Sequence, residues 1–263
     1  MTTPADSSPD SRDESRDRGE NPPARPAGIR RGHSRIPASS APRTGRSDWW
    51  WVPTRNIAYP DGVVAVGGDM EPEALLAAYR AGMFPMPLKG SGSMVWWSPD
   101  PRGVLHLERF LPSRSLRRSI RRYETTIDQC FQEVVEGCAD PSRPHGWITP
   151  TVARAYTRLH ELGWAHSIEV WYEGELVGGM YGVAIGAFFA GESMFHRRRD
   201  ASKVAVARMV ELLKPYREAV FDVQWATPHL VSLGAGEIGR EEYLCRMSTA
   251  TEQPGPFDPG VKR

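Results

Sequence analysis

The sequence has few cysteines, and their number and spacing exclude two kinds of stabilising site. Three occur among 263 residues, Cys130, Cys138 and Cys245, and none belongs to a C-x-x-C pair. An odd number of cysteines without such a pair predicts neither a disulfide framework nor a zinc cluster. We therefore expect a protein of the reducing cytoplasm.

Long apolar stretches, one-sided charge and metal-binding motifs are missing as well. No stretch is long and apolar enough to span a membrane as a helix, and the first residues lack the apolar core of a secretion signal. The formal net charge at pH 7 is +1, so binding to a polyanion must come from local patches. The histidines form no H-x-x-x-H pair and have no cysteine companion at ligand spacing, so we expect neither a metal nor another cofactor.

What the sequence does contain is enough apolar residues for a real core. It is 40% hydrophobic and 25% charged, which is typical of a soluble globular protein. Residues 1–47 are rich in Ser, Pro, Arg and Asp and carry almost no large apolar side chains, so we expect a disordered tail there. We predict a small N-terminal domain over 48–110, a catalytic domain over 111–247 and a flexible C-terminal tail over 248–263.

The periodicity of the apolar residues predicts an α+β fold. Helical spacing over 72–81, 114–122 and 149–162 indicates a mainly helical N-terminal part. From His166 to Phe195 apolar and polar residues alternate, and this favours a meander of about three strands. A helix capped by Asp200 or Ser202 and a strand in AVFDVQW follow. We therefore expect a mixed sheet with flanking helices in the C-terminal part.

The order of these C-terminal elements is similar to the framework of the acyl-CoA N-acyltransferases, the GNAT-like fold. Members of that fold bind pyrophosphate at the N-terminus of the helix that follows the antiparallel strands. Their coenzyme A signature resembles R-x-x-G-x-G/A, whereas the corresponding stretch here, RRRDASKVA, has no glycine. Coenzyme A is therefore disfavoured, while an anion site at this turn stays open.

Eight short blocks carry the most specific pattern in the sequence. They are VAVGGDMEPEALLAAYRAGMFP, WWSPDPRGVL, GWIT, HELGWAHSIEVW, GELVGGMYGV, GESMF, ASK and DVQWATPHLVSLGA. In this order, between about Trp49 and Met247, they closely resemble the bacterial leucyl/phenylalanyl-tRNA-protein transferase family. The resemblance leaves out both tails.

This resemblance implies a soluble enzyme that needs no cofactor. It implies transfer of Leu, Phe or, less readily, Met from an aminoacyl-tRNA to the N-terminal Arg or Lys of a protein, which marks that protein for degradation by the N-end rule. The family has a small N-terminal domain and a GNAT-like catalytic domain. One methylene in an apolar pocket discriminates only about 10- to 200-fold, so the preference among the three amino acids does not follow.

Glu192 is a single carboxylate between an aromatic strand and a basic turn. The resemblance places it at the amino-acid pocket, facing the α-amino group of the esterified amino acid. The apolar side chains predicted to line a cleft for a linear or γ-branched side chain are Met180, Phe188, Phe189, Met194 and Phe195. On residue types alone, ordinary sheet core and an ion pair of Glu192 with one of Arg197 to Arg199 are favoured, and the resemblance reverses this order.

Asp222 and Gln224 in FDVQW form a second candidate centre. Strand alternation puts both on one face, opposite Phe221 and Val223. The resemblance implies that Gln224 accepts a hydrogen bond from the incoming amine while Asp222 orients and polarises Gln224. An α-amine has a pKa of about 8, so positioning contributes more than a strong base. A helix cap or a salt bridge is the alternative for Asp222.

Aromatic residues are expected to hold the 3′ end of the tRNA. Trp147 in GWIT matches a family tryptophan with this role, and an indole stacks on a base for about 1–3 kcal/mol. Of Trp96 and Trp97, one is expected in the core and Trp97 is kept as a substrate-binding candidate. The family commonly has an aromatic residue after FP, where this chain has Met86, so adenosine stacking at Met86 is in doubt.

Basic residues in two stretches are predicted to contact acceptor-stem phosphates. The first stretch holds Arg114, Arg117, Arg118, Arg121 and Arg122, and the second holds Arg197, Arg198, Arg199 and Lys203. Such contacts give salt-dependent binding with little sequence preference. A solvated helix face is the alternative without the family context.

Two other functions stay open. A coenzyme A-dependent N-acetyltransferase fits the order of elements but lacks the glycine motif. A non-catalytic tRNA-binding protein would use the arginines but would give no role to Glu192, Asp222 and Gln224 together. The partners expected from the resemblance are an aminoacyl-tRNA and a protein acceptor.

Overall fold

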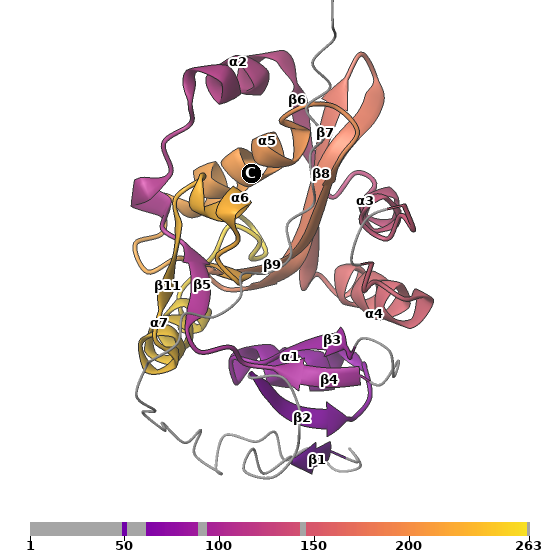
Figure 1. The fold of residues 1–263 in the computed structure, drawn as a ribbon, viewed down its shortest axis with the longest axis vertical. Coiled ribbons are helices and arrows are strands. Elements are labelled where there is room, and N and C mark those ends of the chain that lie inside the picture. The colour runs from indigo at the N-terminus through magenta and orange to yellow at the C-terminus, as the bar shows by residue number, and fades with distance from the viewer. Residues whose placement is uncertain (1–48, 52–61, 89–93, 143–145, 262–263) are drawn as a thin grey trace, which may run out of the picture. The chain divides into compact units, whose positions relative to one another are not determined.

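The computed structural model describes residues 49–51, 62–88, 94–142 and 146–261, and the strands there form two sheets (Figure 1). The predicted N-terminal tail, 1–47, lies outside the described residues. Over the described ranges, no helix has the length and apolar character needed to cross a membrane.

The first sheet has four strands in the order β1-β2-β4-β3, and every neighbouring pair is antiparallel. Its strands are β1 (Trp49–Trp51), β2 (Val63–Gly67), β3 (Phe84–Pro87) and β4 (Met94–Trp97). The helix α1 (Pro72–Arg80) lies between β2 and β3 in the chain and begins with the predicted proline. The expectation of a mainly helical N-terminal part is wrong here, because the apolar runs VVAV and MVWW are too short for helices and pair as strands.

The second sheet has seven strands in the order β11-β5-β10-β9-β8-β7-β6. It is mixed, because β9 and β10 are parallel and the other neighbours are antiparallel. Its strands are β5 (Arg102–Leu105), β6 (Glu124–Ile127), β7 (Ala165–Tyr172), β8 (Glu175–Ile185), β9 (Phe188–His196), β10 (Val220–Gln224) and β11 (Ala235–Ile238). The predicted meander is confirmed as β7, β8 and β9, with its first turn at Glu173 and Gly174.

Helices cover both faces of the second sheet (Figure 1). The remaining elements are the 3-10 turn η2 (Leu107–Arg109), α2 (Arg114–Arg122), α3 (Phe131–Cys138), α4 (Pro150–Glu161), α5 (Ala201–Leu213), α6 (Pro228–Val231) and α7 (Arg240–Glu252). One core cluster packs α2 and α5 against one face of the sheet, and the other packs α1, α3, α4 and α7 against the opposite face. The predicted α+β class, a mixed sheet with flanking helices, is confirmed.

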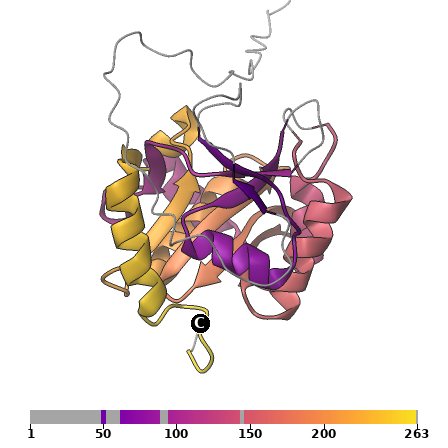
Figure 2. The same ribbon diagram turned by 90° about the horizontal axis from the view of Figure 1, so that it is seen from below.

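The helix α1 connects the two sheets through its neighbours. It contacts both α4 and α7, and Figure 2 shows it lying between these two helices. Leu75 and Tyr79 on α1 are fully buried in the cluster that also holds residues of α3, α4 and α7. The first sheet is thereby held against the same face of the second sheet as α3 and α4.

The boundaries between the predicted domains stay a prediction, but two features bear on them. Strand β5 precedes the predicted boundary at residue 110, yet it is hydrogen-bonded into the second sheet between β10 and β11. The predicted C-terminal tail begins inside α7, and Phe257 beyond that helix is buried against Phe189 and His166. Part of the predicted tail is therefore packed in the fold, and the domain boundaries stay a prediction.

Candidate active site

A buried ion pair joins β10 to the start of β5. Arg102 donates from Nε to Oδ1 of Asp222 (2.9 Å) and from Nη2 to Oδ2 (2.6 Å), and the two side chains are 1% and 0% exposed. They meet because β5 and β10 are antiparallel neighbours. Burial by itself lowers the pKa of Arg102, but Asp222 and Tyr243 raise it above its ordinary value. Arg102 therefore remains charged in the folded protein.

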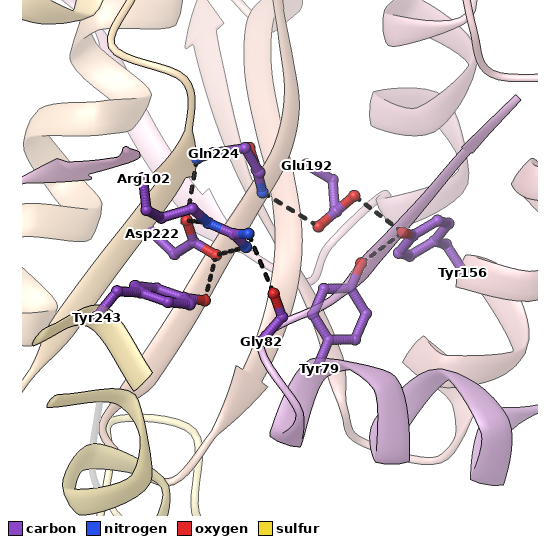
Figure 3. Close-up of polar contacts among 8 residues, drawn as sticks. All are labelled: Tyr79, Gly82, Arg102, Tyr156, Glu192, Asp222, Gln224 and Tyr243. Carbon is purple, nitrogen blue, oxygen red and sulfur yellow. Dashed lines mark hydrogen bonds and ion pairs between the residues drawn. The ribbon is translucent and has the colours of Figure 1, made fainter. Parts of the chain in front are cut away.

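Contacts around this ion pair come from two other parts of the chain, α7 and the segment from Gly82 to Phe84 (Figure 3). Tyr243 on α7 donates its hydroxyl to Oδ2 of Asp222 (2.9 Å), and Arg102 Nη1 donates to the carbonyl of Gly82 (3.2 Å). The guanidinium also lies over the rings of Phe84 (4.8 Å) and Tyr243 (4.5 Å). The pair thus fixes β3, β5, β10 and α7 relative to one another.

Gln224 ends β10 in an unusual backbone conformation. Its φ is 58°, a left-handed value that is uncommon outside glycine, and the register with β5 shifts between Asp222 and Gln224. The backbone N–H of Gln224 donates to Oδ1 of Asp222 (3.0 Å). The structure differs here from the predicted contact, because Asp222 holds the backbone of Gln224 and not its side-chain amide. Asp222 therefore contacts Gln224 through the backbone of Gln224, and the roles of both residues stay a prediction.

Glu192 lies beside Gln224 on the neighbouring strand. Gln224 Nε2 donates to Oε1 of Glu192 (3.5 Å), and the hydroxyl of Tyr156 donates to Oε2 (2.9 Å). The hydroxyls of Tyr156 and Tyr79 are hydrogen-bonded in turn (Figure 3). Glu192 is also the extra residue of a β-bulge, since Gly191 pairs with Gly182 and Ser193 pairs with Tyr181.

The surroundings of Glu192 place its titration near neutral pH. Burial raises the pKa of this carboxyl from 4.5 to about 7, although hydrogen bonds from Tyr79 and Tyr156 lower it. Asp222 raises the pKa further through like-charge repulsion, and Arg102 opposes this. Burial also raises the pKa values of Tyr79 and Tyr156 well above 10, so both hydroxyls stay protonated. A carboxyl with a pKa of about 7 has both its neutral and its ionised form accessible near neutral pH.

The alternative ion pair of Glu192 with the following arginines is not what the structure shows. Arg197 donates to the carbonyl of Leu176 (3.1 Å), Arg198 lies 3.9 Å from Glu175, and Arg199 lies 3.9 Å from Asp200. Glu192 instead accepts hydrogen bonds from Tyr156 and Gln224.

The five apolar residues predicted to line one cleft fall into two packing clusters. Met180, Phe189 and Met194 belong to the cluster that packs against α5. Phe188 and Phe195 belong to the cluster on the other face, where Phe195 contacts Gly137 of α3 closely. The bulge at Glu192 shifts the alternation of β9, so Phe195 faces the same side as Phe188. The structure does not bring the five together, and their role in substrate binding stays a prediction.

The predicted tryptophans differ in their surroundings. Trp96 is fully buried, and its indole N–H donates to the carbonyl of Gly67 (2.8 Å), so it is the core member of the pair. Trp97 is buried as well. Its Nε1 donates to the carbonyl of Met86 (3.2 Å), and its ring lies 5.9 Å from that of Trp225. Trp147 is half-buried and packs against the cluster that contains α4.

The two predicted basic stretches form one surface, which we call the basic surface. The guanidinium groups of Arg122 and Arg198 both lie over the ring of Tyr172, at 4.4 and 4.3 Å. Ser119 of α2 also donates to Asp200 at the start of α5 (3.0 Å). The basic surface comprises Arg114, Arg117, Arg118, Arg121, Arg122, Arg197, Arg198, Arg199 and Lys203; Lys203 is half-buried and the arginines are exposed.

Four residues of the site were not predicted from the sequence. Arg102 stands in the block WWSPDPRGVL, and an arginine inside an apolar strand was a signal that a buried carboxylate lies nearby. Tyr79, Tyr156 and Tyr243 occupy buried positions of helices, where their spacing indicates core packing alone. A buried tyrosine hydroxyl needs a partner, and here the partners are the catalytic candidates. Among the described residues, no group of three His, Cys, Asp or Glu is placed to hold a metal ion.

Family models match most of the described chain. The model described as leucyl/phenylalanyl-tRNA protein transferase matches residues 104–248, and the model for its N-terminal domain matches residues 68–100. Curated relatives named leucyl/phenylalanyl-tRNA–protein transferase include one from Azoarcus sp. (strain BH72), 48% identical over 77% of this chain and 87% of that protein. Another, from Syntrophotalea carbinolica, is 47% identical over 80% of this chain and 93% of that protein.

Solved structures that align with this chain do so with low TM-scores and low sequence identity. A GCN5-related N-acetyltransferase from Kribbella flavida is 11% identical, with a TM-score of 0.33 over 64% of this chain and 61% of that one. The C-terminal domain of a putative lysylphosphatidylglycerol synthetase from Agrobacterium fabrum is also 11% identical, with a TM-score of 0.35 over 67% and 62%. Likeness at this level carries no conclusion about activity.

Proposed function

Because the chain belongs to the leucyl/phenylalanyl-tRNA protein transferase family, we propose that it transfers Leu, Phe and, less readily, Met from aminoacyl-tRNA to the N-terminal Arg or Lys of acceptor proteins. The reaction class, aminoacyl transfer to a protein N-terminus, follows from the family. The finer proposal adds which amino acids are transferred and that the acceptors begin with a basic residue. It also adds that the reaction takes place in the cytoplasm and marks the acceptor for degradation by the N-end rule.

The observation that carries the proposal is the pairing of Glu192 and Gln224 inside the matched region. A carboxylate and an amide from adjacent parallel strands meet at 3.5 Å, and the backbone of each is bulged out of regular strand geometry. Arg102 holds Asp222 on one strand, and the Tyr156 hydroxyl holds the Glu192 carboxylate on the other. A preorganised pair of this kind suits a reaction that needs positioning more than a strong base.

The donor ester is placed by Glu192 in this mechanism. In its ionised form Glu192 pairs with the α-ammonium group of the esterified amino acid. Met180, Phe189, Met194 and Phe195 are the proposed contacts of that amino acid's side chain; the first three lie on the α5 face of the sheet, while Phe195 and Tyr156, the partner of Glu192, lie on the other face. Gly191 is packed tightly beside Met180, because a Cβ there would lie only 3.1 Å from the Phe221 ring and 3.4 Å from Met180.

The acceptor amine is placed by Gln224. Its side-chain NH₂ group donates to Glu192, so its amide oxygen is available to accept a hydrogen bond from the attacking amine. The amine nitrogen adds to the ester carbonyl, the C–N bond forms and the C–O bond to the ribose breaks. One amine proton is transferred to the departing ribose hydroxyl oxygen, and no covalent enzyme intermediate is required.

Asp222 and Arg102 take part by holding Gln224. Oxygen Oδ1 of Asp222 accepts from Arg102 and from the Gln224 backbone N–H, and Oδ2 accepts from Arg102 and Tyr243. These four contacts engage both oxygens of the carboxylate with groups of the protein. Asp222 therefore contributes by holding the left-handed backbone of Gln224, which directs the Gln224 side chain toward Glu192.

The tRNA is bound by the basic surface and Trp147. Exposed guanidinium groups neutralise phosphates and so bind a nucleic acid of the right shape with little sequence preference. Arg197 directly follows β9 and is five residues from Glu192, or about 17 Å of extended chain, a separation that a single-stranded 3′ end can span. Trp147 is the proposed aromatic contact of that 3′ end, and Trp97 stays a candidate for substrate binding.

The experiment is transfer of radiolabelled Leu or Phe from charged tRNA to a peptide that begins with Arg. Matched arms use a peptide that begins with Ala, and labelled acetyl-CoA in place of the tRNA. We expect label from tRNA on the Arg peptide alone. Label from acetyl-CoA alone would overturn the proposal, and equal labelling of the Arg and Ala peptides would overturn the proposed acceptor.

A further inference from the structure

Trp225 is an aromatic side chain that the mechanism does not yet use. It follows Gln224 directly and is 40% exposed. Over residues 62–88, 94–142 and 146–261, no other Trp, Tyr or Phe side chain is exposed. A large exposed indole next to a reactive centre is a typical feature of a binding surface.

The side chain of Trp225 is held rigidly although it is exposed. Its ring packs edge to face with Phe84 (5.1 Å between centroids) and Trp97 (5.9 Å). The backbone at Trp225 lies directly on β5, because a Cβ on Gly103 would be 2.9 Å from Cα of Trp225 and 2.6 Å from its carbonyl carbon. An immobilised aromatic ring loses little entropy when a ligand binds to it.

Trp225 directly follows the residue that is proposed to place the acceptor amine. Gln224 contacts Glu192, the proposed donor contact, through its side chain, while Trp225 packs on Phe84 and Trp97 of the first sheet. Because the reaction brings two substrates to Gln224, the Trp225 side is left for the acceptor.

The charges near the site leave few ways to recognise a basic acceptor residue. Asp222 is neutralised by Arg102 and sealed from solvent, and Glu192 is engaged with Tyr156 and Gln224. An aromatic face attracts a cation without a carboxylate, and indole does so best. A guanidinium group is planar and stacks well on such a face.

We propose that Trp225 binds the basic side chain of the acceptor's first residue through the face of its indole. This proposal rests on the proposed function, and it names the residue that selects the acceptor. It also explains why an exposed indole is held so firmly beside the residue that positions the acceptor amine.

The test compares three peptides that differ only in the first residue, which is Arg, Lys or citrulline. Citrulline has the shape of arginine without its charge, so the ratio of kcat/KM for Arg over citrulline reports recognition of the cation. The variants are Trp225→Phe and Trp225→Leu, and Leu162→Ala, at an exposed apolar residue after α4, is the control. KM for the aminoacyl-tRNA is measured in parallel.

We expect the Arg over citrulline ratio to fall about two- to twentyfold in Trp225→Leu and less in Trp225→Phe, following the order of cation–π strength. KM for the tRNA and all values for Leu162→Ala should stay within twofold. If Trp225→Leu does not fold, the smaller fall in Trp225→Phe tests the same point.

Three outcomes would overturn the proposal. Equal losses for the Arg and citrulline peptides would show a structural role, and a rise in KM for the tRNA alone would show that Trp225 stacks on the terminal base. An unchanged ratio in both Trp225 variants would remove any role in acceptor choice. Absence of transfer from tRNA by the wild-type enzyme to any peptide would instead contradict the proposed function itself.

Discussion

Asp222 and Arg102 form a bidentate ion pair in which both side chains are sealed from solvent, with contacts of 2.9 and 2.6 Å. The two residues are separated by 120 positions in the sequence. The pair connects the strand that carries Gln224 to β5 and, through Gly82 and Tyr243, to the first sheet and α7. It is therefore the anchor of the site, while the groups that meet the substrates are Glu192 and Gln224.

The first prediction concerns Arg102→Met. The substitution leaves the buried Asp222 carboxylate without its counter-charge, and breaking a buried pair from one side costs about 3–5 kcal/mol of unfolding free energy. Urea unfolding followed by circular dichroism measures this loss. Arg158→Met is the control, since its partner Glu161 is exposed and such pairs contribute about 0–1 kcal/mol. Equal small effects of the two substitutions would contradict the anchoring role.

The second prediction concerns the pH dependence of stability at Glu192. Its pKa is about 7 in the folded protein and 4.5 ordinarily, so the folded state binds more protons between these values. The associated stability is present below pH 4.5 and is lost as the pH rises to 7. Glu192→Gln removes this loss and should be more stable than wild type by about 1–3 kcal/mol at pH 8.

The measurement for this second prediction is urea unfolding at pH 5 and pH 8. At pH 5 the wild type and Glu192→Gln should differ little, since wild-type Glu192 is then neutral. Glu161→Gln, at an exposed position, should match the wild type at both values. A wild type that is more stable than Glu192→Gln at pH 8 would show that burial does not raise the pKa of Glu192.

A third prediction follows from the hydrogen bond of Tyr156 to Glu192. That bond lowers the pKa of Glu192, so Tyr156→Phe should raise it. If the ionised form of Glu192 is the active one, the rise of kcat/KM with pH should move upward by about one unit. The pH–rate profile of the transfer reaction shows this shift. Tyr216→Phe, away from the site, should leave the midpoint in place.

The fourth prediction concerns the basic surface. Replacing Arg114, Arg117 and Arg118 by Gln removes three exposed cations from α2. The slope of log Kd for tRNA against log salt should decrease by about 2 to 3, because each phosphate contact contributes about 0.7 to 0.9. Filter binding over a range of salt concentrations measures the slope, while KM for the peptide stays constant. An unchanged slope, as expected for Arg158→Gln, would place the tRNA elsewhere.

The strands that carry Glu192 and Gln224 could be predicted from the sequence because their signals are local. Alternation over 166–195 predicted three strands, and FDVQW predicted the strand that carries Asp222 and Gln224. Pro72 and Thr149 predicted where two helices begin, and the Thr149 hydroxyl does accept from the backbone of Val152. Each of these inferences needs only neighbouring residues.

The contacts that build the site could not be predicted in the same way. The partner of Asp222 depends on the register between β5 and β10, which are joined by more than a hundred residues. The bulge at Glu192 reverses the side to which Phe195 points, and a single extra residue in a strand leaves no mark on the apolar pattern. Tyr172 unites the two basic stretches although neither stretch contains it.

The central claim is that aminoacyl transfer takes place between Glu192 and Gln224. The most direct test is the single-turnover rate of leucine transfer from charged tRNA to an Arg peptide, with Glu192→Gln and wild-type enzyme in excess over the tRNA. We predict a rate at least about 100-fold lower in Glu192→Gln, with the Kd for tRNA within twofold of wild type. A wild-type rate in Glu192→Gln would contradict the claim.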